Sequence, residues 1–251
     1  MRLKIELISN QKVKLPVGYN VYLQALVYNF LDKADSKWLH DEGYRFENRQ
    51  FRLFAFSSIL ERGDYIREKK LFIFPENISF YISSPLEWIL EQIAKNFIKS
   101  TKVRLGSNDC IISSIDVMKP VEFISNSIKV KAITPIEVHS TIVKHDGKKL
   151  TYYYSPFEKE FNNLINENSK KKWKSLFRKD CEYNISIYPH FRGSGYERIV
   201  YFGTGDNKTI IKGWKGYFEV SGKNEILEFI YDAGLGSRNS QGFGMVKVVD
   251  G

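Results

Sequence analysis

Gly234-Leu235-Gly236-Ser237-Arg238-Asn239-Ser240-Gln241-Gly242-Phe243-Gly244 is the most informative stretch of this 251-residue chain. Its four glycines separate a helical pattern over residues 224–231 from a final strand pattern over 243–249. Because glycine allows positive φ and close backbone approach, successive amides of such a loop could point at phosphates, with Arg238 as a charged clamp. The stretch is neither a Walker loop, since it lacks Gly-Lys-Ser/Thr, nor a dinucleotide-binding loop, which follows a strand. The alternative interpretation is a turn that only redirects the chain.

Hydrophobic periodicity predicts the same order of elements on both sides of the chain's midpoint. We expect strand, helix, strand pair, helix and strand in the first half, and the second half repeats this order. The expected strands cover residues 2–9, 51–60, 70–74, 77–83, 103–117, 128–143, 183–191, 199–202, 214–220 and 243–249, and the expected helices cover 19–31, 85–100, 157–177 and 224–231. This order is typical of ferredoxin-like domains.

A short connection near Pro120 and Ser125-Asn126-Ser127 marks the domain boundary. We therefore predict an α+β protein of two tandem ferredoxin-like (RRM-like) domains, residues 1–124 and 125–251. The connection is too short for a flexible linker, so the two sheets are expected to pack as one rigid body.

The chain is basic, with 38 Lys and Arg against 29 Asp and Glu and a net charge of +9. Excess positive charge suggests a polyanion partner, although a solvated surface without a partner explains it equally well. Cys110 and Cys181 are isolated and the four histidines show no zinc spacing, so we expect no metal site and no disulfide. Without a secretion signal or a membrane span, the expected location is cytoplasmic.

The glycine-rich stretch resembles the signature of CRISPR repeat-processing endoribonucleases of the RAMP superfamily: Gly-Leu-Gly, five residues, then Gly-Phe-Gly. The resemblance extends in the right order over nearly the whole chain, through the segments 22–29, Leu39-His40, 53–57, Thr134-Pro135-Ile136 and 155–161. It implies a protein that binds the repeat of a CRISPR precursor transcript and cuts it once per repeat.

The resemblance also implies the chemistry. A ribose 2′-hydroxyl attacks the adjacent phosphorus and leaves a 2′,3′-cyclic phosphate and a 5′-hydroxyl, with no metal and no other cofactor. The expected partners are the precursor and the mature guide RNA. The sequence leaves open whether the protein forms a homodimer or joins a multi-protein interference complex.

Three residues are expected to supply the catalytic groups. His40 matches the family's Leu-His position and is the candidate general acid or base, because imidazole titrates near neutral pH. Tyr28 falls on the family's helical tyrosine and is the candidate proton or hydrogen-bond donor. Some relatives place a lysine near the second strand, where this chain offers Arg45, Arg49 and Arg52; Arg52 matches best and could only stabilise charge.

The expected RNA contacts are more widely spread. They come from the glycine-rich stretch and from two basic segments that we expect to form hairpins, and the residues concerned are Gly234, Gly236, Ser237, Arg238, Asn239, Ser240, Gly242, Gly244, Arg192, Lys208, Lys212 and Lys215. Lysines there would contact phosphates, and an aromatic such as Trp214 could stack on a base. The run Lys170-Lys171-Lys172-Trp173-Lys174 is more often a solvated helix face.

Two other functions remain open from the sequence. A RAMP-type protein of the same fold could hold repeat RNA without cutting it, and the arginine in place of the family lysine favours this alternative. An RNA-binding protein unrelated to CRISPR would instead bind generic single strands.

Overall fold

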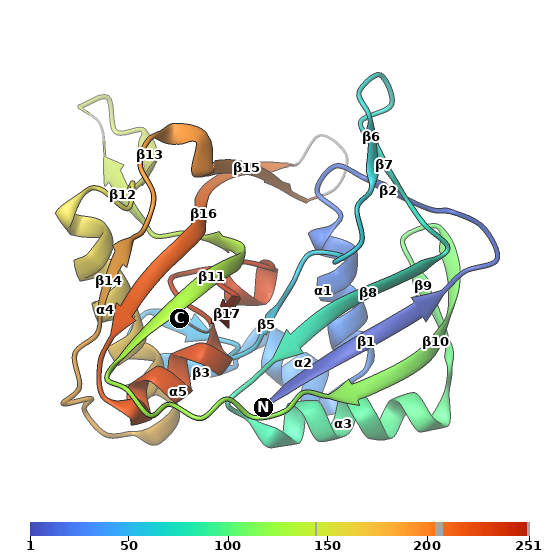
Figure 1. Ribbon diagram of the computed structural model, residues 1–251, viewed down its shortest axis with the longest axis horizontal. Helices are drawn as coiled ribbons and strands as arrows, with labels where there is room; N and C mark the ends of the chain where they lie inside the picture. The colour runs from blue at the N-terminus through green and yellow to red at the C-terminus, as the bar shows by residue number, and fades with distance from the viewer. Residues whose placement is uncertain (144, 204–207, 250–251) are drawn as a thin grey trace.

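The computed structural model describes residues 1–143, 145–203 and 208–249, and it places two antiparallel sheets side by side (Figure 1). The first sheet has the strand order β5-β8-β1-β10-β9. Its strands are β1 (Arg2–Ile8), β5 (Ala55–Phe56), β8 (Asn77–Ser83), β9 (Lys102–Leu105) and β10 (Asn108–Val117). Helix α1 (Asn20–Asn29) follows β1, and helix α3 (Glu87–Lys99) follows β8. Apart from β9, this is the ferredoxin-like arrangement predicted from the sequence.

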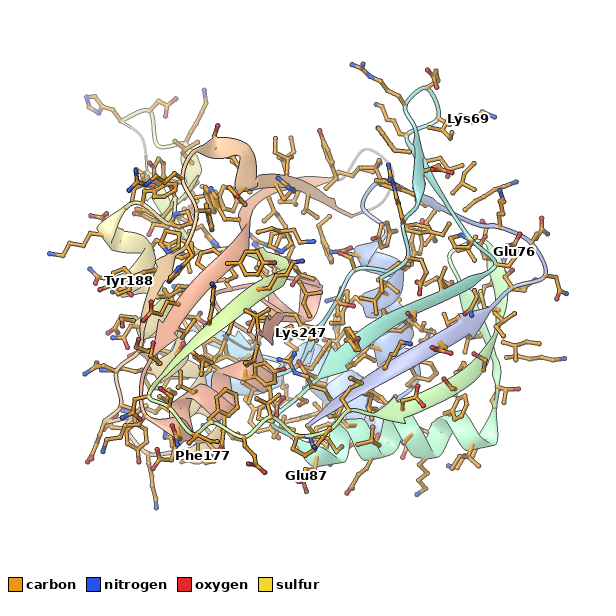
Figure 2. All side chains as sticks on the ribbon, in the orientation of Figure 1. Lys69, Glu76, Glu87, Phe177, Tyr188 and Lys247 are labelled. Atoms are coloured by element: carbon orange, nitrogen blue, oxygen red, sulfur yellow. The ribbon has the colours of Figure 1, made fainter. Side chains whose placement is uncertain are left out.

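The second sheet repeats the arrangement with the order β14-β16-β11-β17, and β15 pairs with β16. Its strands are β11 (Ser127–Ile136), β14 (Ser186–Pro189), β15 (Glu197–Phe202), β16 (Thr209–Ser221) and β17 (Val246–Val248), with the helices α4 (Lys159–Phe177) and α5 (Asn224–Ala233). Tyr188 and Lys247 mark its two edge strands in Figure 2. The predicted fold of two tandem ferredoxin-like domains is confirmed, and the proposed boundary between residues 124 and 125 lies in the connection from β10 to β11.

Several elements depart from the sequence expectation. The stretch of residues 32–50, expected to be irregular, contains α2 (Lys33–Asp41) and the hairpin of β3 (Tyr44–Phe46) and β4 (Arg49–Phe51). The strand expected over 51–60 contracts to β5, because Leu53 adopts a left-handed φ of 52° that interrupts extended backbone. The strand expected over 128–143 divides into β11 and β12 (His139–Val143), which pairs with β13 (Lys149–Tyr153). A small sheet of β2 (Val13–Pro16), β7 (Leu71–Phe74) and β6 (Asp64–Ile66) projects from the first domain, with Lys69 near its tip (Figure 2).

The hydrophobic core is continuous across the two domains. On β1, the alternating residues Leu3, Ile5 and Leu7 are at most 1% exposed, as the period-two pattern predicts. Each such side chain contributes about 1.5–3 kcal/mol when it is fully buried. The same cluster of buried side chains includes Phe161 of α4 and Ile230 of α5.

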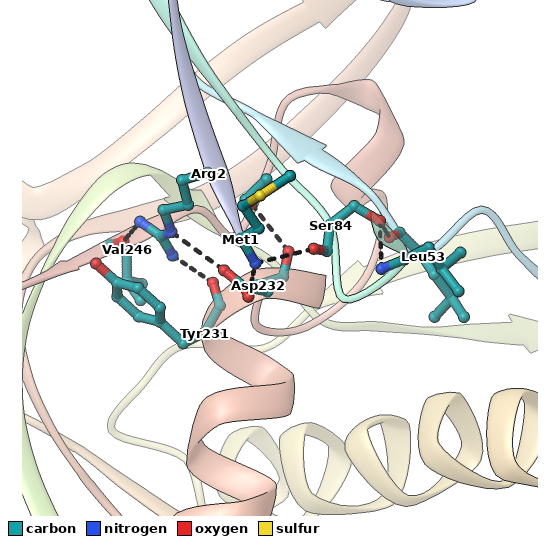
Figure 3. A network of polar contacts seen from close by, with 9 residues as sticks. Met1, Arg2, Leu53, Ser84, Tyr231, Asp232 and Val246 are labelled. Atoms are coloured by element: carbon teal, nitrogen blue, oxygen red, sulfur yellow. Dashed lines mark hydrogen bonds and ion pairs between the residues drawn. The ribbon is translucent and has the colours of Figure 1, made fainter. Parts of the chain in front are cut away.

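A polar joint also ties the first strand to the end of α5 (Figure 3). The Arg2 guanidinium stacks 3.3 Å from the centroid of the Tyr231 ring and donates to the carbonyl oxygens of Tyr231 and Val246. The amino group of Met1 pairs with Asp232, the residue that follows Tyr231. Because Arg2 is only 8% exposed, these contacts replace water for a buried cation and hold the two domains together. Within the described part of the chain, no helix combines the length and apolar character needed to cross a membrane.

Candidate active site

The three residues predicted to be catalytic lie together at one end of the first domain. Tyr28 lies in the last turn of α1, His40 in the last turn of α2, and Arg52 directly after β4. The Tyr28 and His40 rings meet edge to face, with centroids 5.5 Å apart. The packing of α1 against α2 thus brings together an imidazole and a phenol that are twelve residues apart in the sequence.

Arg52 lies close to both His40 and Tyr28. Its Nη2 donates to the main-chain carbonyl oxygen of His40, and also to the Gln50 side chain at 3.2 Å. Burial raises the pKa of Tyr28, and the adjacent Arg52 guanidinium acts in the opposite direction. The phenol is therefore protonated at neutral pH and can donate a hydrogen bond.

The other two candidate arginines lie elsewhere. Arg45 is exposed on β3, where its carbonyl oxygen accepts a hydrogen bond from Arg178 at the end of α4. Arg49 lies on β4 and lines a cavity between the domains. Of the three, Arg52 is the one whose guanidinium reaches both His40 and Tyr28.

The His40 imidazole is accessible and oriented. Its side chain is 68% exposed, and Nδ1 lies 2.8 Å from an Asp41 carboxylate oxygen. In the tautomer that donates the Nδ1 proton to Asp41, Nε2 carries the lone pair that can accept a proton. His40 and Tyr28 border a surface cavity of about 670 Å³ that Lys33 and Lys37 also line. The arrangement can move a proton and bind a phosphate.

The backbone around Leu53 places Arg52. Its left-handed φ of 52° is uncommon for a bulky residue and costs energy that the surroundings must offset. The Leu53 carbonyl oxygen accepts a hydrogen bond from Ser84 (Figure 3), and Phe54 packs edge to face against Tyr28 with the ring centroids 5.6 Å apart. The turn leaves Arg52 facing α1 and α2 while Leu53 and Phe54 enter the core.

The glycine-rich loop packs more tightly than the sequence suggests. A Cβ atom on Gly244 would lie 1.9 Å from the Leu235 carbonyl oxygen, and one on Gly236 would lie 2.3 Å from that of Glu137. Several loop amides already donate to protein carbonyl oxygens, and these donors are Gly234, Leu235, Ser237, Gln241, Gly242 and Gly244. The expectation that successive loop amides point at phosphates is therefore wrong for these six amides. The side chains of Ser237, Arg238 and Ser240 remain partly exposed.

Lys172 holds this loop in shape, and the sequence analysis missed it. The run of lysines was expected to be solvated, but Lys172 is 3% exposed. Its ammonium donates to the carbonyl oxygens of Gly234 and Gly236, each at 2.7 Å, and to Asn239 Oδ1 at 2.6 Å. The helical spacing from Phe161 and Ile165 places residue 172 on the buried face of α4, a signal that could have identified it.

The loop also contacts the first domain, close to the predicted catalytic residues. Gln24 of α1 donates to the Ser240 carbonyl oxygen at 2.6 Å, and Asn20 donates to that of Gln241 at 3.2 Å. Arg52 and Arg238 line one cavity of about 300 Å³ between the domains. The loop therefore shares one cavity with Arg52 and is bonded to Gln24, which lines the neighbouring cavity of Tyr28 and His40.

The other predicted RNA contacts lie apart from this surface. Arg192 is exposed beside a second cavity, and Lys212 pairs with Glu197 across the β15–β16 hairpin at 3.3 Å. Burial lowers the pKa of Lys215, as do nearby Arg198 and Lys131. Lys208 precedes β16 and is partly exposed. Trp214 is 4% exposed, so the expectation that it could stack on a base is wrong.

Comparison with known proteins identifies the family. The model "CRISPR associated protein Cas6, C-terminal" matches residues 118–248, more than half of the chain, and "CRISPR-associated protein Cas6, N-terminal" matches residues 14–116. The chain is 27% identical over 253 residues to CRISPR-associated endoribonuclease Cas6 1 of Methanocaldococcus jannaschii, covering 100% of this chain and 93% of that protein. It is also 27% identical over 257 residues to CRISPR-associated endoribonuclease Cas6 of Pyrococcus furiosus, covering 99% and 90%.

A solved structure described as an RAMP protein binding different RNA substrates has the same fold, with a TM-score of 0.79 and 21% identity over the whole of both chains. The resemblance seen in the glycine-rich stretch thus extends to both domains. Matched by family models in each half, the chain belongs to the Cas6 family of CRISPR-associated proteins.

Proposed function

We propose that this chain is an endoribonuclease that cuts precursor CRISPR RNA within its repeats. The relatives named endoribonucleases, which align over the full chain, support RNA cleavage. The observation that carries the proposal is the closeness of His40, Tyr28 and Arg52, the first two of which border an open surface cavity. This arrangement provides a proton acceptor, a proton donor and a fixed cation, which cleavage of a phosphodiester requires.

The proposed reaction is attack of a ribose 2′-hydroxyl on the adjacent phosphorus. Nε2 of His40 accepts the hydroxyl proton as the bond from O2′ to phosphorus forms. Arg52 stabilises the charge that develops on the phosphoryl oxygens, because its planar fork matches their geometry. The bond from phosphorus to O5′ breaks, and the leaving oxygen takes a proton from Tyr28 or from water. The products are a 2′,3′-cyclic phosphate and a 5′-hydroxyl, formed without a metal ion.

The RNA strand is proposed to follow the surface between the two domains. Ser237, Arg238 and Ser240 offer side-chain contacts, while the glycines and Asn239 act by giving the loop its shape. Arg192, Lys208, Lys212 and Lys215 would contact RNA farther from the cut. The solved RAMP protein of the same fold is described as binding RNA substrates, which supports this role.

A repeat-holding protein that does not cut is the second candidate, because Arg52 remains charged and cannot act as an acid. The test is to incubate synthetic repeat RNA from the host's own CRISPR array with the native protein, His40→Ala and His190→Ala. His190 is a matched control: it also pairs with a carboxylate, Glu219 at 3.0 Å, and it lies directly after β14 in the second domain. We expect one cut per repeat with the native protein and with His190→Ala, and none with His40→Ala. Tight binding without any cut by the native protein would favour the repeat-holding function.

A further inference from the structure

A second histidine is paired with a carboxylate in the cavity between the two domains. His139 begins β12, and its Nδ1 lies 3.0 and 3.1 Å from the two carboxylate oxygens of Glu137. The His139 side chain is 23% exposed, whereas that of Glu137 is fully buried. His139 lines the same cavity of about 300 Å³ as Arg52. No role for His139 was predicted from the sequence.

Glu137 also pairs with Arg238 of the glycine-rich loop. Arg238 Nε lies 2.8 Å from Glu137 Oε1 as an ion pair, yet its N–H is not aligned for a hydrogen bond, and the buried atom has no hydrogen-bond partner in the described chain. The Glu137 carbonyl oxygen accepts from the Ser237 amide at 2.8 Å, which fixes the loop beside it. A buried carboxylate is costly unless it is paired, so its presence here fixes both His139 and Arg238 in place.

The first domain also contributes cationic side chains to the lining of this cavity. Arg49 and Arg52 reach it from the first domain, and no Asp or Glu is found among the described residues that line it. Lys172 lies at the base, where its ammonium is occupied by the loop carbonyls. Arginine side chains from both domains that line one small cavity match a bound anion with several oxygen acceptors.

We propose that this cavity binds a phosphodiester of the RNA adjacent to the one that is cut, through His139 and Arg238, with Glu137 as their positioning residue. The inference rests on the proposed function, because it takes the cut to occur at His40. Arg52 links the two places: it contacts the His40 carbonyl oxygen and lines the cavity. A strand that passes His40 and continues over Arg52 enters the cavity at its next phosphate.

The test measures coupling between a side chain and a single phosphate. The substrates are a series of repeat RNAs from the host's array, each with a 2′-deoxy sugar at the cut site. In each RNA of the series, one phosphate around the cut is replaced by a neutral methylphosphonate. The dissociation constant is measured for the native protein, His139→Gln and His190→Gln. At one phosphate next to the cut, the neutral group should weaken RNA binding about tenfold in the native protein and in His190→Gln. In His139→Gln the same group should weaken binding less than threefold, because the effects of two groups that interact are not additive.

The same methylphosphonate series is measured with Arg238→Gln, so the result does not depend on either variant alone. Glu137→Gln, which keeps the side-chain length, should raise KM and reduce the phosphate effect while leaving kcat near the native value. If the methylphosphonate effects are the same in the native protein, His139→Gln and Arg238→Gln at every position, the inference is wrong. A native protein that binds but never cuts unmodified repeat RNA would contradict the proposed function instead, and the phosphate cycle would still be measured.

Discussion

Arg52 donates a hydrogen bond from Nη2 to the main-chain carbonyl oxygen of His40, twelve residues away in the sequence. Its guanidinium also lies against Tyr28, where burial raises the pKa of the phenol and the arginine opposes that rise. One side chain therefore joins the end of α2 to the last turn of α1. We therefore propose that Arg52 acts as a fixed cation close to His40.

Replacing Arg52 should affect cleavage much more than binding. Loss of a preorganised donor to a developing charge typically costs about 100- to 1,000-fold in rate, so Arg52→Ala should reduce the single-turnover rate by that range. Arg52→Lys retains the charge but loses the planar fork, so its rate should lie between those of Arg52→Ala and the native protein. Arg45→Ala is the matched control, since Arg45 lies on β3 against the end of α4. Native cleavage by Arg52→Ala, measured on the same repeat RNA, would exclude this role.

Tyr28→Phe tests the donor. Because burial raises the pKa of Tyr28 above its ordinary value of 10.0, the hydroxyl is protonated throughout the neutral range and does not titrate there. We expect cleavage to slow by about 100-fold, with the shape of the rate profile between pH 5 and pH 9 unchanged. A limb of the profile that disappears in Tyr28→Phe would show that the phenol ionises in this range, contrary to the structure.

Removing Lys172 should destabilise the fold. Lys172→Met leaves the carbonyl oxygens of Gly234 and Gly236 and the Asn239 amide oxygen without their buried donor. Breaking a buried charged group's interactions costs about 3–5 kcal/mol, which urea unfolding can measure. Lys171→Met, at the partly exposed neighbouring position on α4, should change the unfolding free energy by less than about 0.5 kcal/mol. Equal stability of the two variants would contradict the contacts at Lys172.

Lys172 should also give stability a pH dependence of defined sign. Burial lowers its pKa to about 7 in the folded protein, against 10.5 in an unfolded chain, while Glu137 acts in the opposite direction. Between about pH 7 and pH 10.5, Lys172 carries its proton in the unfolded chain and has lost it in the folded protein. The contribution of Lys172 to the free energy of unfolding therefore rises with pH in this range, by at most about 1.4 kcal/mol per pH unit. The difference between native and Lys172→Met should therefore grow from about pH 7 upward. A difference that stays constant or shrinks would be the contrary result.

Glycine at position 244 is required by space as well as by its φ of 72°. An added Cβ would lie 1.9 Å from the Leu235 carbonyl oxygen, a backbone atom that has little room to move. Gly244→Ala should lower the unfolding free energy by more than about 3 kcal/mol. At Gly195, where φ is not positive and nothing lies within 4 Å of an added Cβ, alanine should change stability by less than about 1 kcal/mol. Similar melting temperatures for the two variants would contradict this packing.

The fold was predictable because its main elements carry strong local patterns. Leu3, Ile5 and Leu7 alternate as a half-buried strand does, and the order of such elements in each half allows few topologies. The hairpin of β3 and β4 was missed because its strands are three residues long and largely polar, so their pairing depends on tertiary context.

The candidate site was only partly predictable. Family resemblance pointed to His40, Tyr28 and Arg52, and their closeness in space depends on how α1 packs on α2. Lys172 was misjudged because a run of lysines suggests solvent, although helical spacing from Phe161 placed it on the buried face. Glu137, directly after β11, pairs with His139 two residues further on and with Arg238 in the glycine-rich loop; the second contact joins residues far apart in the sequence, which no local pattern encodes.

The most direct measurement is cleavage of the cognate repeat RNA in excess EDTA, using native RNA and RNA with one 2′-deoxy sugar at the cut. The account predicts that native protein cuts the first RNA at an unchanged rate, leaves a 2′,3′-cyclic phosphate and a 5′-hydroxyl, and does not cut the second. Binding of both RNAs should be equal within about threefold, since a single hydroxyl contributes little to a contact dominated by phosphates. Cleavage of the 2′-deoxy RNA, or loss of cutting in EDTA with binding retained, would contradict attack by the 2′-hydroxyl without a metal.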